Sequence, residues 1–299
     1  MRVLVTGVGG FLGGALARAL LARGHQVAGT WVDAPFHWPG VEPHEADVRD
    51  AARLREVMRE TAPDAVVHLA GLSHVGESWT RMPEYFQVNV LGTENVLAAA
   101  AGGPRVVVAS SAEVYGQVPE DEQPIGEARP PAPRTPYALT KAAAERLALT
   151  RGAIVARSFN LVGAGQSPSF ALPAFAAQLA AMAESGEPVL RVGNLTPRRD
   201  FVHVEDGAEA FALLAERGEP GTVYNVASGC APSMAEALAR LIALAGVAAR
   251  VEEDPERVRP VDLPLLRGDA SRLRGLGWSP RRGLDDALAD LWAAVRPGG

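Results

Sequence analysis

Five runs of apolar residues recur along the first half of the chain, separated by stretches with helical patterning. The runs are RVLVT (2–6), HQVAGTWV (25–32), DAVVHLA (64–70), RVVVAS (105–110) and AIVARSF (153–159). Each is continuous rather than alternating, which is typical of strands that are buried on both faces. Buried strands that alternate with helices indicate a parallel, doubly wound sheet. We therefore predict an α/β protein.

Helical patterning continues through the second half of the chain. The expected helices lie at about 11–23, 50–61, 80–101, 136–150, 170–185, 204–217, 233–245 and 283–296. A short extended piece should lead to Asp47, and the proline-rich EARPPAPRTP (127–136) should be a loop, since prolines there would interrupt any regular element.

Composition restricts what this protein could bind. The chain has 299 residues, a net charge of -6 and no basic run, so we expect neither nucleic acid nor an anionic membrane as a partner. No charged leader with an apolar segment opens the sequence, and no apolar stretch is long enough to span a bilayer. The single cysteine, Cys230, excludes an internal disulfide and suits a reducing compartment. We expect a cytoplasmic protein.

Three glycines follow the first apolar run, in VTGVGGFLGG. Gly7, Gly10 and Gly13 are spaced three apart, between a predicted strand and a predicted helix. Glycines there permit a tight turn and let backbone N–H groups approach a pyrophosphate at the positive end of the helix. A turn alone would also need glycine, but the strand–turn–helix context favours dinucleotide binding. We expect these glycines, with Phe11 and Leu12, to bind the cofactor of a Rossmann domain.

The order of the elements divides the chain into two domains. We predict that residues 1–162 form the dinucleotide-binding domain and that parts of 200–228 complete it, since TVYNV (222–226) has the pattern of one further strand. The rest of 163–299 mixes short strands with helices. We expect it to form most of a smaller, mixed α/β domain that binds the substrate.

The end of the second run should select between NAD and NADP. An acid about twenty residues beyond the glycines would bind the ribose 2′-OH of NAD, whereas an arginine would accept the phosphate of NADP. Trp31 and Asp33 lie at the end of this run and are the candidate contacts; no arginine lies near it, and Asp33 comes slightly late and can belong to the turn. This leaves the choice open. Asp47 and Val48 can contact the adenine, although an acid before the next helix, at Asp50, is equally well a capping residue.

The segment TPYALTK (135–141) contains the only lysine of a chain with 29 basic residues. Arginine serves at every other basic position, so Lys141 indicates a site that needs a compact amine. Tyr137 lies four residues earlier, on the same face of a predicted helix. An ammonium there would lower the tyrosine pKa from about 10 towards neutrality and could bind the nicotinamide ribose. A surface helix pair is the simpler alternative, but the glycine loop favours catalysis.

The cluster SSAEVYG (110–116) follows the fourth run. Ser111 stands at the end of a buried strand, where it could share the substrate oxygen with Tyr137. Glu113 follows two residues later and could be a proton-transfer group or an ordinary surface charge.

Taken together, these motifs resemble the extended short-chain dehydrogenase/reductases that act on nucleotide sugars, in the NAD-dependent epimerase/dehydratase family. The matching segments cover essentially the whole chain in the family's order: TGVGGFLGG, HLAG, SSAEVYG, YALTK, RSFNLVGAG, RRDFVHVED and YNVASG. The resemblance implies a Rossmann fold, a nicotinamide cofactor and catalysis by Ser111, Tyr137 and Lys141.

The resemblance also assigns residues to the two ligands. It implies cofactor contacts by Leu69, Ala70 and Gly71, and substrate contacts by Ser73, His74, Ser111, Glu113, Asn160, Arg199 and Arg259. The two arginines match residues that bind the diphosphate, which suits their planar fork, although each could instead form a surface salt bridge of little value. His74 could touch the sugar, although a lone histidine is more often structural.

Three stretches are most similar to reductases of GDP-4-dehydro-6-deoxy-mannose: SHVGESW, GAGQSPSFALPAFA and RPVDLPLLRGDASRL. Such an enzyme would reduce the C4 keto group with hydride from NADP(H) or NAD(H), the former slightly favoured, with Tyr137 as proton donor and no metal. Glu113 also matches an acid of GDP-mannose 4,6-dehydratases. These, or a 4-epimerase with tightly bound NAD(P), are the alternatives; in a reductase Glu113 would only orient the substrate. We expect a homodimer through helices 80–101 and 136–150.

Overall fold

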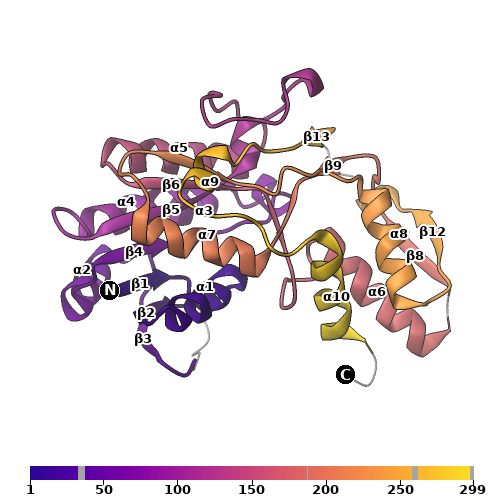
Figure 1. Ribbon diagram of the computed structural model, residues 1–299, viewed down its shortest axis with the longest axis horizontal. Helices are drawn as coiled ribbons and strands as arrows, with labels where there is room; N and C mark the ends of the chain where they lie inside the picture. Colours follow the sequence, from indigo (N-terminus) through magenta and orange to yellow (C-terminus); the bar gives the residue numbers. More distant parts are fainter. Residues whose placement is uncertain (33–37, 187, 258–261, 297–299) are drawn as a thin grey trace.

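The computed structural model describes residues 1–32, 38–186, 188–257 and 262–296, and its centre is a sheet of seven strands (Figure 1). Their order across the sheet is β11-β6-β5-β4-β1-β2-β3, and every pairing is parallel. The strands are β1 (Arg2–Thr6), β2 (Gln26–Trp31), β3 (Val41–Glu45), β4 (Ala65–His68), β5 (Arg105–Ser111), β6 (Ile154–Ser158) and β11 (Val223–Val226). The predicted doubly wound α/β fold is confirmed.

The chain changes its direction of travel across the sheet after β3. β1 lies between β2 and β4, so that Thr6 pairs with Thr30 on one side and with His68 on the other. The first connections lead outward to β2 and β3, and the later ones continue from β4 the other way. Loops that leave neighbouring strand ends in opposite directions open a crevice, and open α/β sheets bind their ligands there. In this protein the crevice lies at the carboxyl ends of β1 and β4.

Successive side chains of β1 enter two different hydrophobic cores. The helices beside the sheet are α1 (Phe11–Ala22), α2 (Ala51–Thr61), α3 (Met82–Tyr85), α4 (Gly92–Ala99), α5 (Pro136–Thr150) and α7 (Val204–Arg217). Val3 and Val5 face α1 and α7, whereas Leu4 faces α2 and α4. A strand with apolar side chains on both faces needs a helical layer on each, and these helices supply both.

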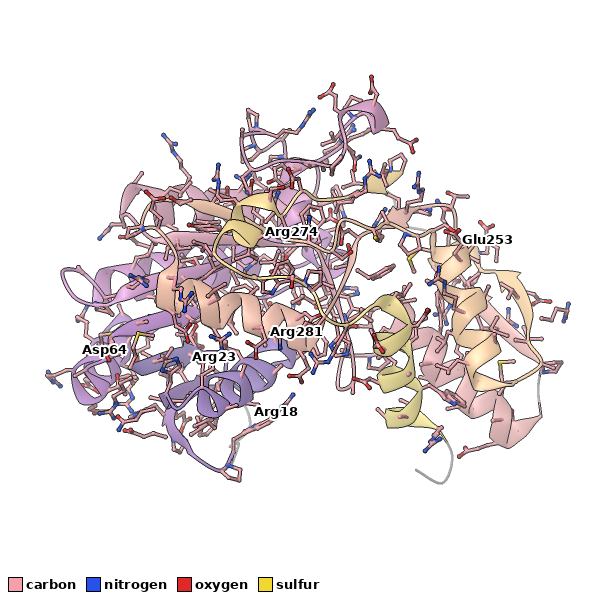
Figure 2. All side chains as sticks on the ribbon, viewed as in Figure 1. Arg18, Arg23, Asp64, Glu253, Arg274 and Arg281 are labelled. Atoms are coloured by element: carbon pink, nitrogen blue, oxygen red, sulfur yellow. The ribbon has the colours of Figure 1, made fainter. Side chains whose placement is uncertain are left out.

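Ion pairs join α1 to α7, which lie side by side (Figure 2). The Arg23 guanidinium lies 2.5 Å from the Glu209 carboxylate and 2.8 Å from that of Glu216, and Arg18 lies 2.8 Å from Glu205. These partly exposed pairs stabilise the contact by at most about 1 kcal/mol each. Helix α7 thus returns from the second half of the chain to cover the sheet beside α1.

A smaller lobe with its own hydrophobic core lies to the right of the sheet in Figure 1. It consists of α6 (Ala171–Ser185), β8 (Val189–Val192), α8 (Met234–Ala245), β12 (Arg250–Glu253) and α10 (Leu284–Val295). β8 and β12 pair in parallel, and Leu179, Leu190 and Leu241 are fully buried beneath the helices. The three helices agree with those expected at 170–185, 233–245 and 283–296.

Short elements connect the sheet to this lobe. They are β7 (Asn160–Val162) paired with β10 (Phe201–His203), β9 (Arg198–Arg199) paired with β13 (Leu265–Leu266), α9 (Ser271–Gly275), and the single turns η1 (Glu77–Trp79), η3 (Ala112–Tyr115), η4 (Glu120–Glu122) and η5 (Pro255–Arg257). As expected, 127–136 has no helix or strand until α5 begins at Pro136. In the described ranges no helix is both long and apolar enough to cross a membrane.

The buried Asp200 carboxylate fastens three of the connecting segments together. It accepts hydrogen bonds from the backbone N–H groups of Ser228, Gly229 and Gly268 at 2.8 to 3.1 Å. We expect Asp200→Ala to lower the free energy of unfolding by about 3–5 kcal/mol, because it leaves buried donors without an acceptor. Urea unfolding would measure this. The exposed Asp121→Ala is the control, and a loss below about 1 kcal/mol for Asp200→Ala would contradict the role.

Candidate active site

The glycine loop joins β1 to α1 with almost no free space. Gly7 has a φ of +71°, and a Cβ on it would lie 2.9 Å from the backbone of Ala70. The Gly7 carbonyl accepts the Gly10 N–H at 3.0 Å, and a Cβ on Gly13 would lie 2.3 Å from that carbonyl oxygen. Only glycine fits at both positions. Helix α1 begins at Phe11 with no side chain capping its first N–H groups.

This loop fits the pyrophosphate of a dinucleotide. It occupies the crevice at the carboxyl ends of β1 and β4, where free N–H groups at the start of a helix attract an anion. Leu69, Ala70 and Gly71 follow β4 and form the other side of the crevice, with the Leu69 N–H bonded to the Thr6 carbonyl. The structure therefore brings the predicted cofactor residues of both loops together. Leu12 packs half-buried against the main core.

The predicted adenine and ribose contacts are only partly described. Trp31 ends β2, and Asp33 lies outside the described residues. Asp47 is held by the backbone and guanidinium of Arg49, and this hydrogen bonding lowers the pKa of its carboxyl. Val48 is a core residue, so that only its backbone could face an adenine. Asp50 caps α2 by accepting the N–H groups of its first turn at 3.0 Å.

The crowding around Gly13 allows its role in dinucleotide binding to be tested by substitution. We expect Gly13→Ala to weaken dinucleotide binding at least tenfold, because the new methyl group meets the Gly7 carbonyl and must displace the loop that approaches the pyrophosphate. Fluorescence titration with NADPH would measure the dissociation constant. Gly126→Ala is the matched control, since a Cβ there meets nothing within 4 Å. Equal affinities of the two variants would contradict the assignment.

The three predicted catalytic residues meet at the ends of β5 and α5. Thr135 caps α5 by accepting the Ala138 N–H at 3.1 Å, so the helix starts immediately before Tyr137. Tyr137 is buried and its hydroxyl lies close to that of Ser111, the last residue of β5. One turn later, the Lys141 amine donates to the Ala109 carbonyl at 3.0 Å.

The electrostatics of the site differ from the expectation in one respect. Burial raises the pKa of Tyr137 to about 12; the neighbouring Ser111 hydroxyl lowers it and the negative charge of Glu113 raises it further. The sequence predicted a pKa lowered by Lys141, and this was wrong because desolvation of the phenolate dominates. Removal from water also lowers the pKa of Lys141 to about 8. Tyr137 therefore retains its proton at neutral pH.

Glu113 lies within the site rather than on an open surface. It is half-buried in the turn η3, its N–H donates to the Ser111 hydroxyl at 3.2 Å, and its charge reaches Tyr137. A carboxylate beside a proton donor can orient a sugar hydroxyl or accept a proton.

Asn89 is a site residue that the sequence reasoning missed. The helices expected across 80–101 are α3 and α4, and between them lies a π-helical turn, η2 (Phe86–Leu91), in which the Asn89 side chain is buried. Its side-chain oxygen accepts a hydrogen bond from the Leu72 N–H at 2.8 Å, and its side-chain nitrogen donates to the Leu72 carbonyl and the Thr140 hydroxyl at 3.0 Å. It thereby joins the loop after β4 to the helix of Lys141. A polar residue inside an apolar helical pattern, in QVNVLGT, was the available signal.

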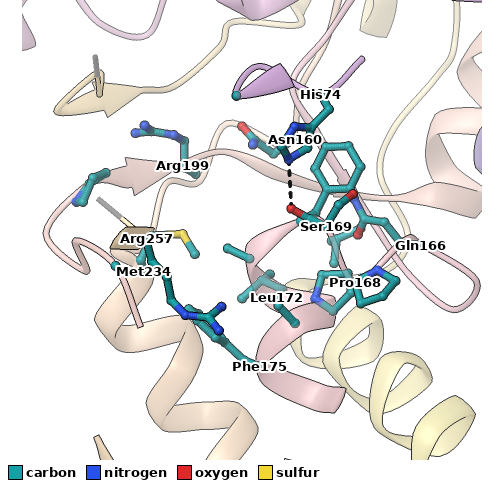
Figure 3. A pocket seen from close by; sticks show the side chains of 18 of the residues that line it. His74, Asn160, Gln166, Pro168, Ser169, Leu172, Phe175, Arg199, Met234 and Arg257 are labelled. Atoms are coloured by element: carbon teal, nitrogen blue, oxygen red, sulfur yellow. Dashed lines mark hydrogen bonds between the residues drawn. The ribbon is translucent and has the colours of Figure 1, made fainter. Parts of the chain in front are cut away.

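A cavity of about 580 Å³ lies between the sheet edge and the smaller lobe. Figure 3 shows His74 and Asn160 at one end and Arg257, Met234 and Phe175 at the other. Its volume is that of a site for an organic ligand. Arg257 and Asp262, which both line it, were missed although they flank the predicted Arg259 in sequence.

None of Ser111, Tyr137 and Lys141 lines the described part of this cavity, and its end near His74 is linked to them through Asn160. Asn160 follows β6, whose Ser158 pairs in register with Ser111. The His74 Nδ1 accepts the Glu77 N–H at 3.1 Å, so its proton lies on Nε2 and is donated to the Ser169 carbonyl at 3.2 Å. The histidine thus joins the loop after β4 to the loop before α6.

The remaining predicted substrate residues have different surroundings. Arg199 lines the cavity but is buried. Its guanidinium binds the Asp262 carboxylate and the Leu263 carbonyl, so this ion pair does not lie on the surface. Arg259 lies outside the described residues. Ser73 is exposed and does not line the described part of the cavity. No cluster of three or more metal-binding side chains occurs within the described ranges.

A Rossmann sheet with a glycine loop at its switch point, and a serine, a tyrosine and a lysine beside it, define a short-chain dehydrogenase/reductase. Residues 3–227 match the model of the NAD dependent epimerase/dehydratase family, and the chain belongs to this family. The predicted family, and its class of NAD(P)-dependent enzymes, are confirmed.

Full-length relatives carry several activities. The chain is 37% identical, over an alignment of 310 residues, to GDP-6-deoxy-D-mannose reductase of Pseudomonas aeruginosa, covering 99% of this chain and 98% of that protein. The structure of RMD from Pseudomonas aeruginosa complexed with NADPH has a TM-score of 0.84 at 35% identity over 98% of both chains. Thermus thermophilus UDP-glucose 4-epimerase, solved with NAD, has a TM-score of 0.89 at 32% identity over 100% of both chains.

Proposed function

We propose that the protein reduces the C4 keto group of a GDP-4-dehydro-6-deoxy-hexose at the expense of NAD(P)H. The observation that carries this proposal is the buried Tyr137 hydroxyl, which keeps its proton at neutral pH and lies beside Ser111 at the end of β5. A ketone becomes an alcohol by gaining one hydride at carbon and one proton at oxygen. The nicotinamide would supply the hydride, and Tyr137 donates the proton.

Each residue of the site has a role in this reaction. Ser111 donates a hydrogen bond to the keto oxygen and so orients it towards the Tyr137 hydroxyl. The Lys141 ammonium binds the nicotinamide ribose and stabilises the phenolate that remains after proton donation.

The other assignments follow the two loops and the cavity. The loops 7–13 and 69–71, with Trp31, Asp33, Asp47 and Val48, bind the dinucleotide. Ser73, His74 and Asn160 contact the sugar, and Arg199 and Arg259 the diphosphate. Residues 1–162 with parts of 200–228 thus form the dinucleotide domain, and most of 163–299 the substrate domain.

A second candidate is a 4,6-dehydratase or a 4-epimerase. Two observations favour it: the position of Glu113 beside Tyr137, where a carboxylate could remove a proton next to the keto carbon, and the similarity to a UDP-glucose 4-epimerase. Such enzymes regenerate their cofactor in each cycle. The purified protein would then carry nicotinamide and need none added.

We also propose a homodimer in the cytoplasm. Large apolar side chains are exposed on the face formed by η1, α3, η2 and α5, where Leu91 of η2 is 59% and Leu139 of α5 is 42% exposed. Solvent-exposed leucines on adjacent helices suit a helix-to-helix contact between two copies. Sedimentation velocity would measure the mass. The single exposed Cys230 suits a reducing compartment.

The function is tested by mixing purified protein with GDP-4-dehydro-6-deoxy-mannose and either NADPH or NADH, and following the nicotinamide absorbance. We expect the absorbance to fall, faster with the preferred coenzyme, and the same assay with a UDP-linked 4-keto sugar measures the base preference. Loss of water from GDP-mannose without added cofactor would instead assign the second candidate, with Glu113 as the base.

A further inference from the structure

A buried ion pair lies two turns along α5 from Tyr137. Glu145 and Arg157 are only 2% and 3% exposed in their side chains. The Arg157 Nε lies 3.0 and 3.1 Å from the two oxygens of the Glu145 carboxylate, and its Nη2 donates to one of them. The other oxygen accepts the Ser110 hydroxyl at 2.8 Å. The pair therefore joins α5 to β6 and to the residue before Ser111 on β5.

Arg157 extends this network to the turn that carries Glu113. Its guanidinium lies over the Tyr115 ring, 4.6 Å from the centroid, and its Nη1 donates to the Glu127 carbonyl at 3.4 Å. The Tyr115 hydroxyl donates in turn to Asn225 of β11 at 2.7 Å. The Arg157 guanidinium thus contacts α5, η3 and the loop before α5 directly, and it is linked to β5 through Glu145 and to β11 through Tyr115.

The joined segments are those that carry the catalytic residues. Tyr137, Lys141 and Glu145 follow one another at four-residue spacing, on one face of α5. The helix is fixed to β5 at two successive residues, by Lys141 at the Ala109 carbonyl and by Glu145 at the Ser110 hydroxyl. The next residue of β5 is Ser111. A shift of α5 along the strand would therefore change the distance from the Tyr137 hydroxyl to Ser111.

Stability alone is a poor explanation for such a pair. Desolvating two charges offsets most of their attraction, and apolar residues of similar volume often serve as well or better. A bidentate ion pair fixes one relative position of the helix and the strand, which apolar side chains do not. Reactions that need aligned groups are sensitive to shifts of about 1 Å, which can slow them about a hundredfold.

We infer that Glu145, through Arg157 and Ser110, is a positioning residue that sets the alignment of Tyr137 and Lys141 with Ser111. It does not touch substrate or cofactor, and it acts on the chemical step rather than on binding. The inference rests on the proposed reductase function for its kinetic test.

The decisive variant is the double substitution Glu145→Met with Arg157→Met, which removes both charges and keeps side-chain volume. We expect it to melt within a few degrees of the parent but to have kcat lowered 10- to 100-fold, with both KM values within threefold. With 4-deuterated NADPH, the isotope effect on kcat should rise, because hydride transfer becomes rate-limiting. A purely structural pair would give a stable double variant with parental kcat, and that result would overturn the inference.

Asp206→Asn is the matched control. Asp206 is a buried carboxylate that accepts the N–H groups of Arg281 and Arg282, at the start of α7 and away from α5. We expect it to lower stability while kcat and the isotope effect stay parental. An equal loss of kcat in this control would mean that any damage to a buried carboxylate slows the enzyme, and would also overturn the inference.

A second readout does not depend on the substrate. Lys141 is the only lysine, so acetylation by acetic anhydride followed by mass analysis of the peptide that contains it reports on this amine separately from the amino terminus. We expect the double variant to acetylate Lys141 at least fivefold faster at pH 8, and the control at the parental rate. If the parent proves not to be a reductase, an unchanged acetylation rate in the double variant would still overturn the positioning role.

Discussion

Replacing Tyr137 with phenylalanine is expected to lower kcat by roughly 10²- to 10⁴-fold, the usual contribution of a positioned general acid. The substitution removes one hydroxyl from a buried ring and leaves the glycine loop untouched. When hydride reaches the carbon, no proton donor then stands at the position of the missing hydroxyl to protonate the keto oxygen. The dissociation constant for NADPH should stay within about threefold. Steady-state kinetics and fluorescence titration measure the two quantities.

Tyr224→Phe is the matched control for this variant. Tyr224 is a buried tyrosine on β11, and its hydroxyl accepts the Glu219 N–H at 3.1 Å, outside the site. We expect its kcat within twofold of the parent. If Tyr137→Phe retained more than a tenth of the activity, another group must donate the proton, and Glu113→Gln in that background would identify the most obvious candidate.

Lys141→Arg is expected to lower kcat about 100-fold or more although it keeps the positive charge. The amine lies 3.0 Å from the Ala109 carbonyl, and a Cβ on Gly71 would lie 3.4 Å from it, so the space accommodates a compact head. A planar guanidinium is longer and wider, and it cannot place a donor at the same point. Near-parental turnover would show that only the charge matters and would contradict the proposed geometry.

The pH dependence of the same variant is a further part of this test. Lys141, with a pKa of about 8, is protonated below that pH and loses its charge as the pH rises through it. Because the ammonium stabilises the tyrosinate left after proton donation, kcat for reduction should fall above pH 8. The pKa of Tyr137, about 12, lies beyond this window. The residual activity of Lys141→Arg should not show the fall, since arginine does not titrate there. A parental rate that rises through pH 8 would refute the role.

The parts of the fold and site that the sequence predicted depend on local patterns. The apolar runs became the parallel strands because burial on both faces leaves no room for polar alternation. Gly7 and Gly13 were identifiable because backbone crowding excludes every other residue. Tyr137 and Lys141 meet because four-residue spacing fixes a common helix face.

The features that were missed depend on contacts between distant segments. The bond between Arg199 and Asp262 spans 63 residues, and no spacing rule relates them. The inward turn of Asn89 depends on a π-helical turn that propensity does not encode. The pKa of Tyr137 was predicted in the wrong direction because depth of burial, unlike a neighbouring lysine, cannot be counted along the chain.

The return of the chain to the sheet at α7 and β11 has a consequence for biosynthesis. The edge strand Val223–Val226 pairs with β6, but about sixty residues, which include helices α6 and α7, separate them in sequence. The nascent chain therefore cannot complete the sheet until residue 226 has left the ribosome. A message truncated after codon 162 would leave β6, an internal strand of the complete sheet, as an exposed edge and helix α1 uncovered, a surface that chaperones and proteases recognise.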